Sequence, residues 1–273
     1  MNDRVTRFAA PLLLLAALAA GVLVSSDLDI ADPDPEAVDE LQAVLSGLED
    51  GTAVLVGFDP DVGTYAEVRP TVRTLIAELA GRGMDISMVS LTPEGRALAL
   101  AERDRAERLA PDAPAVADLG FVPGAEAALV TVASAIAGTS EVATPTGTAA
   151  LDGIGLIVVV GGNDLGPRSW VEQVLPRIDA VPVIAITPIS LLPEVEPYRQ
   201  SGQLAAVIAT PRDGAAYRLA ADLGPYADLG DAGGGPAALA IVIGLLAAIA
   251  WLGEILVRRI APALAARPER DRS

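Results

Sequence analysis

The sequence predicts an α/β protein with a parallel sheet, held between two membrane-spanning helices. Three observations lead to this class: a long apolar segment near each end of the chain, short continuous apolar runs between them, and helical periodicity in the stretches that separate those runs. Continuous apolar runs that alternate with helices are typical of a parallel sheet covered on both faces. Right-handed crossovers then give a doubly wound, mostly parallel, Rossmann-like sheet.

The two apolar segments, Phe8–Val24 and Ala237–Val257, are long enough to cross the roughly 30 Å hydrocarbon core of a bilayer. Arginines flank each segment on its outer side only, at Arg4, Arg7, Arg258 and Arg259. Because positive flanks stay in the cytoplasm, we expect a protein of the cytoplasmic (plasma) membrane with both termini cytoplasmic and an extracytoplasmic central domain. A cleaved signal peptide, ending near Ser25–Ser26, is the alternative for the first segment, and it exports the same domain.

The chain is acidic and lacks lysine. Of its 19 basic residues, all arginine, 12 fall in the central region, against 32 of the 36 acidic residues, so this region carries a net charge near −20. Nucleic acids and anionic lipid surfaces are poor partners for such a domain. The chain has no cysteine, so it forms no disulfides.

The missing residue types exclude several classes of chemistry. Without histidine, cysteine or lysine, the chain cannot form a Ser-His-Asp triad, a cysteine nucleophile, a Schiff-base lysine, a Walker A site or a His/Cys zinc site. Carboxylate, hydroxyl, arginine and backbone groups remain. An enzyme built from these groups would use oxygen ligands and Mg²⁺ or Ca²⁺.

The central region opens with an acidic, proline-punctuated spacer, Asp27–Pro35, and then alternates between apolar runs and helical spacing. Gly138–Thr148 is predicted to be a long polar insertion, and Gly224–Gly235 a linker back to the membrane. The predicted strands are Thr52–Phe58, Ile86–Leu91, Ala115–Leu119, Ile154–Val160, Val181–Ile186 and Leu204–Ala209. The predicted helices are Glu36–Leu48, Tyr65–Ala80, Glu94–Leu109, Ala125–Ala137, Arg168–Leu175 and Gly214–Ala221.

These elements define the expected organisation of the chain. The parts are an N-terminal transmembrane helix (1–25), a spacer and helix (26–50), the extracytoplasmic Rossmann-like domain (51–224), a linker (225–235), a C-terminal transmembrane helix (236–258) and a basic cytoplasmic tail (259–273).

Three predicted strands end in threonine followed by proline, at Thr92, Thr187 and Thr210. Threonine at the N-cap with proline at the first helical position explains this pattern locally, since the hydroxyl accepts a free N–H and proline has none to satisfy. The same hydroxyls could also contact a ligand, because open α/β sheets bind ligands at the carboxyl ends of their strands.

Acidic and amide side chains leave two other strands. Asp59 and Asp61 follow the first strand, and Gly162, Asn163 and Asp164 follow the fourth. In a doubly wound sheet these strands can be neighbours, which would bring the three aspartates together as ligands of a divalent cation. The alternative is that they form turns at the strand ends.

The arrangement of these acids resembles the haloacid dehalogenase-like phosphohydrolases, in which an Asp-x-Asp follows the first strand. This resemblance implies a hydrolase with Asp59 and Asp61 as nucleophile and acid/base, Thr92 or Ser90 as the phosphate contact, and Asp164 as a ligand of Mg²⁺. The lysine of that family has no counterpart here, since the chain contains none.

A broader resemblance covers most of the central region and is carried by several short stretches in this order. They are Phe58–Pro70, Ser90–Gly95, Asp118–Gly124, Trp170–Gln173 and Pro197–Ala206. Together they are similar to an uncharacterised group of prokaryotic membrane-anchored proteins with an exported α/β domain. The resemblance implies that architecture and no particular activity.

The function predicted from the sequence is that of a membrane-anchored, extracytoplasmic binding or interaction module, an accessory component of a cell-envelope assembly. Its candidate ligand contacts are Asp59, Asp61, Thr92, Gly162, Asn163, Thr187 and Thr210. This hypothesis expects another envelope or membrane protein as the partner, no nucleic acid and no cofactor. Two alternatives stay open: the Mg²⁺-dependent hydrolase, and a structural subunit of a membrane complex whose alanine-rich helices pack closely.

Overall fold

The structure is a computed structural model that describes residues 34–230. The two predicted membrane segments, Phe8–Val24 and Ala237–Val257, lie outside this range. Between residues 34 and 230, none of the helices is both long and apolar enough to cross a membrane.

A single six-stranded sheet, with all its strand pairs parallel, forms the centre of the domain, in the order β3-β2-β1-β6-β7-β8. Taken in chain order these strands run 3-2-1-4-5-6, which is the order of the Rossmann fold. The first and fourth strands, β1 and β6, are therefore direct neighbours, as predicted. The strand bounds are β1 Ala53–Asp59, β2 Asp85–Ser90, β3 Ala117–Phe121, β6 Ile154–Gly161, β7 Val183–Ile186 and β8 Ala206–Ile208.

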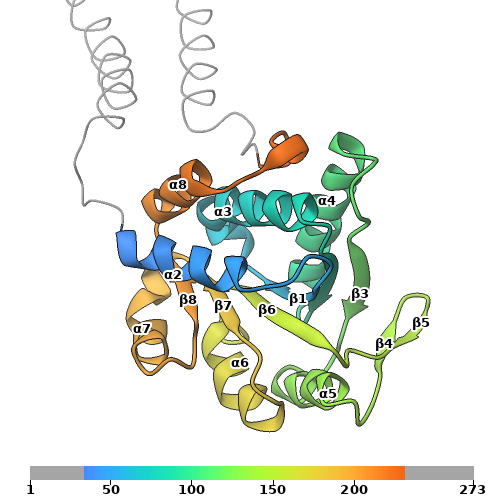
Figure 1. Cartoon of the computed structure of the whole chain (residues 1–273). Helices are drawn as coiled ribbons and strands as arrows, with labels where there is room; N and C mark the ends of the chain where they lie inside the picture. Colours follow the sequence, from blue (N-terminus) through green and yellow to red (C-terminus); the bar gives the residue numbers. More distant parts are fainter. Residues whose placement is uncertain (1–33, 231–273) are drawn as a thin grey trace, which may run out of the picture. The chain divides into compact units, whose positions relative to one another are not determined.

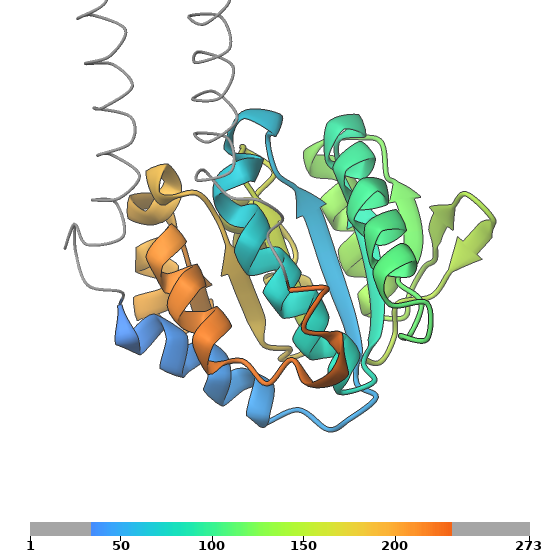
Figure 2. The same ribbon diagram turned by 90° about the horizontal axis from the view of Figure 1, so that it is seen from above.

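Helices cover both faces of the sheet (Figures 1 and 2). One layer contains α2 (Pro35–Ser46), α3 (Val62–Gly81), α4 (Pro93–Leu109) and α8 (Pro211–Ala220). The other layer contains α5 (Glu126–Ile136), α6 (Pro167–Gln173) and α7 (Leu192–Gln200). Three short 3₁₀ turns complete the path: η1 (Leu175–Arg177), η2 (Ile189–Leu191) and η3 (Gly224–Tyr226).

Strand β1 shows why the apolar runs are continuous rather than alternating with polar residues. Val54, Val56 and Phe58 pack into the layer of α3, while Leu55 packs into the layer of α6. Because both faces are buried, the positions of the strand before Asp59 have apolar or small side chains. Gly57 is the small one, since a Cβ there would overlap the indole ring of Trp170 on α6.

The six predicted strands and six predicted helices are all present, with ends that differ by a few residues. One helix, α7, was not predicted, because Pro193 and Pro197 interrupt its sequence. Proline lacks the N–H of a helical hydrogen bond, and it is tolerated at the start of a helix, where Pro193 lies.

The predicted polar insertion at Gly138–Thr148 contains a two-stranded antiparallel hairpin, β4 (Val142–Thr144) and β5 (Gly147–Ala149). Its turn packs on β3 at Gly120, where a Cβ would lie 2.9 Å from Pro145 Cδ. Gly120 has a φ of +88°, which favours glycine. The hairpin thus lies beside the outermost strand of the main sheet.

The domain also extends beyond its predicted limits of 51 and 224. Helix α2, predicted as a helix ahead of the domain, buries Ala37, Val38 and Leu41 in the main core and so belongs to the α/β domain. Residues 224–230, predicted to be the start of a linker, pack against the domain and bury Leu229. We call these residues the C-terminal strap.

Replacing Gly57 by alanine is expected to lower the free energy of unfolding by about 1–3 kcal/mol, because the added methyl group overlaps the ring of Trp170. Gly63→Ala is the matched control: it adds the same methyl group in open space in the first turn of α3, and should leave stability equal or up to about 1 kcal/mol higher. Chemical denaturation of both variants measures this difference. Equal stability of the two variants would contradict the packing at Gly57.

Candidate functional site

The candidate site is the carboxyl edge, by which we mean the carboxyl ends of the parallel strands and the loops that follow them. Doubly wound sheets bind ligands where the strand order reverses, and here that point lies between β1 and β6. The loops after these strands contain most of the candidate residues predicted from the sequence.

Asp59 is the last residue of β1, and its side chain is only 1% exposed. Its carboxylate accepts hydrogen bonds from three donors at the end of β2: Leu91 N at 2.9 Å, Thr92 N at 2.8 Å and Thr92 Oγ1 at 2.8 Å. A Cβ at Gly95 would overlap the Phe58 carbonyl and lie 2.7 Å from Asp59 Oδ1, so α4 begins directly against this group. Asp59 is therefore a buried link between β1 and the start of α4, rather than a turn residue.

Burial has the largest effect on the pKa of this carboxyl group. It raises the pKa of Asp59 from 3.8 to about 6, while the hydrogen bonds from Thr92 and Leu91 lower it. The group is thus ionised at neutral pH, where it accepts the three hydrogen bonds, and becomes protonated in mild acid.

The loops after β1 and β6 are in direct contact. The backbone carbonyl of Asp59 accepts from Asn163 Nδ2 at 3.0 Å and from Gly162 N at 3.4 Å. A Cβ at Gly162 would lie 2.7 Å from Thr64 Oγ1, on the first turn of α3. The amide of Asn163 also reaches Asp61 Oδ1 at 3.5 Å. These contacts join the two loops at the point where a Rossmann fold has its ligand crevice.

The three aspartates considered as metal ligands have different surroundings. The carboxylate of Asp59 is directed to the end of β2, whereas that of Asp61 lies beside Asn163 on the β6 side. Asp164 is exposed, and its backbone carbonyl accepts from Ser169 Oγ. Within residues 34–230, no group of three or more acidic side chains is placed to hold a metal ion.

Two of the three Thr-Pro sites are helix caps, as predicted. The hydroxyl of Thr92 accepts from Gly95 N at 2.9 Å, and that of Thr210 accepts from Asp213 N at 3.0 Å. Thr187 has another role: its buried hydroxyl donates to the carbonyl of Gly161 at 2.9 Å and so links β7 to β6. Ser90 acts in the same way between β2 and β1, since its hydroxyl donates to the carbonyl of Phe58 at 2.9 Å. The hydroxyls that could have bound a phosphate group therefore hold the strand ends together.

Carboxylates of the chain itself occupy several backbone donors at the starts of helices. Besides Asp59, Glu94 accepts from Val62 N at 2.7 Å at the start of α3. Glu67 accepts from Ile189 N at 2.8 Å, at the start of η2. Such donors are where doubly wound proteins bind phosphate groups. Here they are satisfied within the chain.

Asp213 plays the same part at the start of α8. Its carboxylate accepts from Thr210 N at 3.2 Å in a capping box, and from Asp34 N at 2.8 Å, just before α2. The sequence carries the signal for this cap, since Thr210 is followed three residues later by an acid. Glu94 and Glu67 have no such signal, because their partners are 32 and 122 residues away in the chain.

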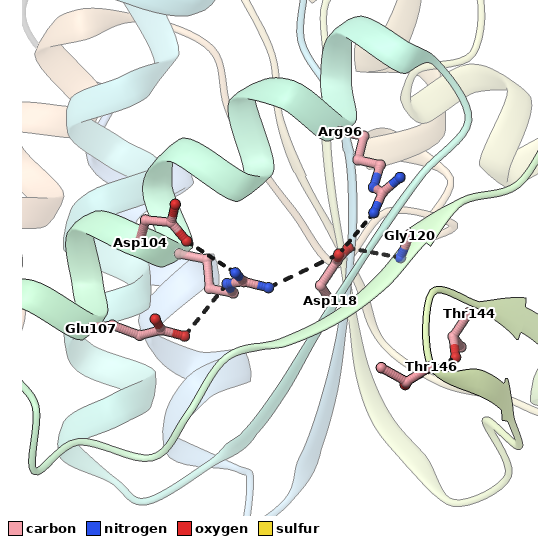
Figure 3. Close-up of polar contacts among 8 residues, drawn as sticks. Arg96, Asp104, Glu107, Asp118, Gly120, Thr144 and Thr146 are labelled. Carbon is pink, nitrogen blue, oxygen red and sulfur yellow. Dashed lines mark hydrogen bonds and ion pairs between the residues drawn. The ribbon is translucent and has the colours of Figure 1, made fainter.

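Arginines near the start of β3 are paired with acids (Figure 3). Asp118 lies between Arg96 Nη2 at 3.3 Å and Arg103 Nη1 at 4.0 Å, and it also accepts from Gly120 N at 2.8 Å. Arg103 further contacts Asp104 and Glu107. The positive charges on this part of α4 are thus neutralised by neighbouring carboxylates.

Comparisons of the chain with protein-family models, with curated proteins and with solved structures find no match. The fold class therefore rests on the strand order, and the function has to be argued from the geometry of the carboxyl edge.

The raised pKa of Asp59 predicts a pH-dependent stability. A carboxyl group whose pKa is higher in the folded state than in the unfolded state stabilises the fold below pH 3.8, and this contribution is lost as the pH rises through about 6. Relative to Asp59→Asn, the native protein should lose on the order of 2–3 kcal/mol of unfolding free energy between pH 4 and 7. Denaturation of both proteins across this range measures the difference. Asp61→Asn is the control, since Asp61 makes no side-chain cap hydrogen bond, and a flat difference for Asp59→Asn would disprove the prediction.

Proposed function

We propose that the chain is a membrane-anchored, extracytoplasmic interaction module that contacts another envelope or membrane protein through the carboxyl edge of its sheet. One observation supports this proposal most directly. At the carboxyl edge, carboxylates and loops of the chain itself occupy positions where other doubly wound folds bind small ligands. Membrane attachment and export rest on the sequence, through the two apolar segments and their arginines.

An anionic ligand would have to displace the chain's own carboxylates. At the starts of α4 and α3, backbone donors are taken by Asp59 and Glu94, and the edge carries further acids at Asp61 and Asp164. Between residues 34 and 230 the sequence has 28 acids and 12 arginines. Repulsion and lost hydrogen bonds therefore both oppose a nucleotide or phosphate ester at this edge.

The hydrolase alternative needs Asp59 as an exposed nucleophile. Its carboxylate is 1% exposed and accepts hydrogen bonds from Leu91 and Thr92, so an attack on a substrate would require that group to leave its partners. This geometry favours a structural role for Asp59 and an interaction role for the edge.

Apolar side chains on the same edge support contact with a protein surface. Val62, the first residue of α3, is 63% exposed, and Ile189 after β7 is 52% exposed. Glu67 on α3 accepts from the backbone of Ile189, so the two segments are joined. Exposed aliphatic side chains beside polar groups are a common composition of protein interfaces.

We also propose that the chain belongs with the group of prokaryotic membrane-anchored proteins that it resembles. Stretches that carry this resemblance include the loops after β1 and β2, which form part of the carboxyl edge. The proposal implies that the carboxyl edge has the same interaction role in the other members of the group.

The topology can be tested with reporters at two positions. A reporter fused after Ser273 should be cytoplasmic, and one inserted between Thr146 and Gly147, in the exposed turn of the hairpin, should be external, because arginines flank only the outer ends of the apolar segments. Protease accessibility in spheroplasts measures both. Protection of the hairpin insertion would overturn the proposed export.

The interaction itself can be tested by photo-crosslinking in intact cells. A photoreactive amino acid at Val62 or Ile189 should capture one specific envelope or membrane protein, because these side chains lie exposed on the carboxyl edge. Leu219, which is 90% exposed near the end of α8, is the control position and should not capture it. The same product from Leu219, or none from the edge, would contradict the proposal. Mg²⁺-dependent hydrolysis of a phosphate ester that is lost in Asp59→Asn would favour the hydrolase instead.

A further inference from the structure

An apolar cavity lies at the other end of the domain, away from the carboxyl edge. It has a volume of about 200 Å³ and lies between the C-terminal turns of α3 and α4, the loop that leads into β3, and the C-terminal strap. Its buried walls are Ile76, Ala80, Ala106, Val116 and Leu229.

The cavity persists because its walls are small or rigid. Ala80 and Ala106 leave space where the helices end, and Pro111 and Pro114 restrict the loop that could otherwise collapse into it. The cavity is open to solvent on the side of Pro111, Pro114 and Ala115, which are exposed, so a ligand can enter it there.

The chemistry of the walls selects the ligand. The side chains of the buried walls are hydrocarbon and include no hydrogen-bond donor or acceptor. They therefore cannot offset the free-energy cost of removing a charged ligand from water. The acid on the rim, Glu107, is paired with Arg103 (Figure 3). Cavities of about 150 Å³ with apolar walls accept a benzene molecule, so about 200 Å³ is enough for a ring with a small substituent or for a short alkyl chain.

One wall belongs to the strap, and an arginine on α4 donates to the backbone of the strap. Arg105 Nη1 donates to the carbonyl of Leu229 at 2.7 Å, and Arg105 Nη2 donates to that of Asp228 at 3.2 Å. Leu229 is 2% exposed and packs on Ala77, Ala80 and Ala106. A group bound in the cavity would therefore contact the strap directly.

We propose that this cavity is a binding site for a small uncharged apolar group, an aromatic ring or a short alkyl chain, and that its occupant holds the strap against α3 and α4. The inference is independent of the interaction proposed for the carboxyl edge. It assigns a second site, defined mainly by apolar contacts.

The test uses the full chain in lipid nanodiscs with ¹³C-labelled methyl groups and toluene as the probe. Toluene should give saturable shifts at the methyl groups of Ile76, Val116 and Leu229, and it should slow amide exchange in residues 224–230. Ala106→Leu should abolish both effects, because the larger side chain fills the cavity. Val130→Leu is the matched control: it adds one methylene on the exposed side of α5 and should leave binding unchanged.

Further outcomes are decisive. If Ala106→Leu does not fold, Ala110→Leu, which fills the rim of the same cavity, takes its place. Shifts that persist in the filled variants, or that spread equally to Leu41 in the main core, would overturn the site.

A lipid with a spin label on its acyl chain separates the two sources of such a group. Broadening at Leu229 that toluene reverses identifies a lipid chain, and no broadening together with saturable toluene shifts identifies a free small molecule.

Discussion

The hydrogen bonds of Asp59 determine how the three central strands end. Its carboxylate holds Leu91 and Thr92 at the end of β2, and its backbone carbonyl holds Gly162 and Asn163 after β6. A buried carboxylate must have such donors, since removing it from water without them costs several kcal/mol. Because one residue satisfies both neighbours, neither loop can move away from β1 without leaving a buried polar group unpaired.

This constraint extends along the carboxyl edge. With the start of α4 fixed by Asp59, Glu94 on its first turn reaches the backbone of Val62 at the start of α3. Glu67 on α3 in turn reaches Ile189. The starts of α3, α4 and η2 are thus held by carboxylates from neighbouring elements. The edge that forms a crevice in dinucleotide-binding proteins is here a set of internal contacts, which leaves its outer surface as the part available to a partner.

Sequence patterns predicted the sheet and much of its edge, but not the direction of individual side chains. Continuous burial on both faces produces the apolar runs, and the topology then makes β1 and β6 neighbours. The expected neighbourhood of these two strands favoured a joint site for Asp59, Asp61 and Asp164. The strand ends at Asp59, however, and Asp61 is already the N-cap of α3, so the two carboxylates turn toward different strands. Contacts such as Glu67 with Ile189 leave no local pattern, because they join distant segments.

The two ends of the domain differ in what they offer a ligand, and the difference follows from the direction of the helices. At the carboxyl edge the helices begin, and acids of the chain accept from backbone N–H groups at the starts of α3, α4 and α8. At the opposite end Ala80 and Ala106, in the last turns of α3 and α4, leave a space lined mostly by apolar groups. Arg105 donates to the backbone carbonyls of Asp228 and Leu229. These hydrogen bonds hold the strap against the space. Several backbone donors of the carboxyl edge are thus satisfied within the domain, while the opposite end has an apolar site with one wall formed by the C-terminal strap.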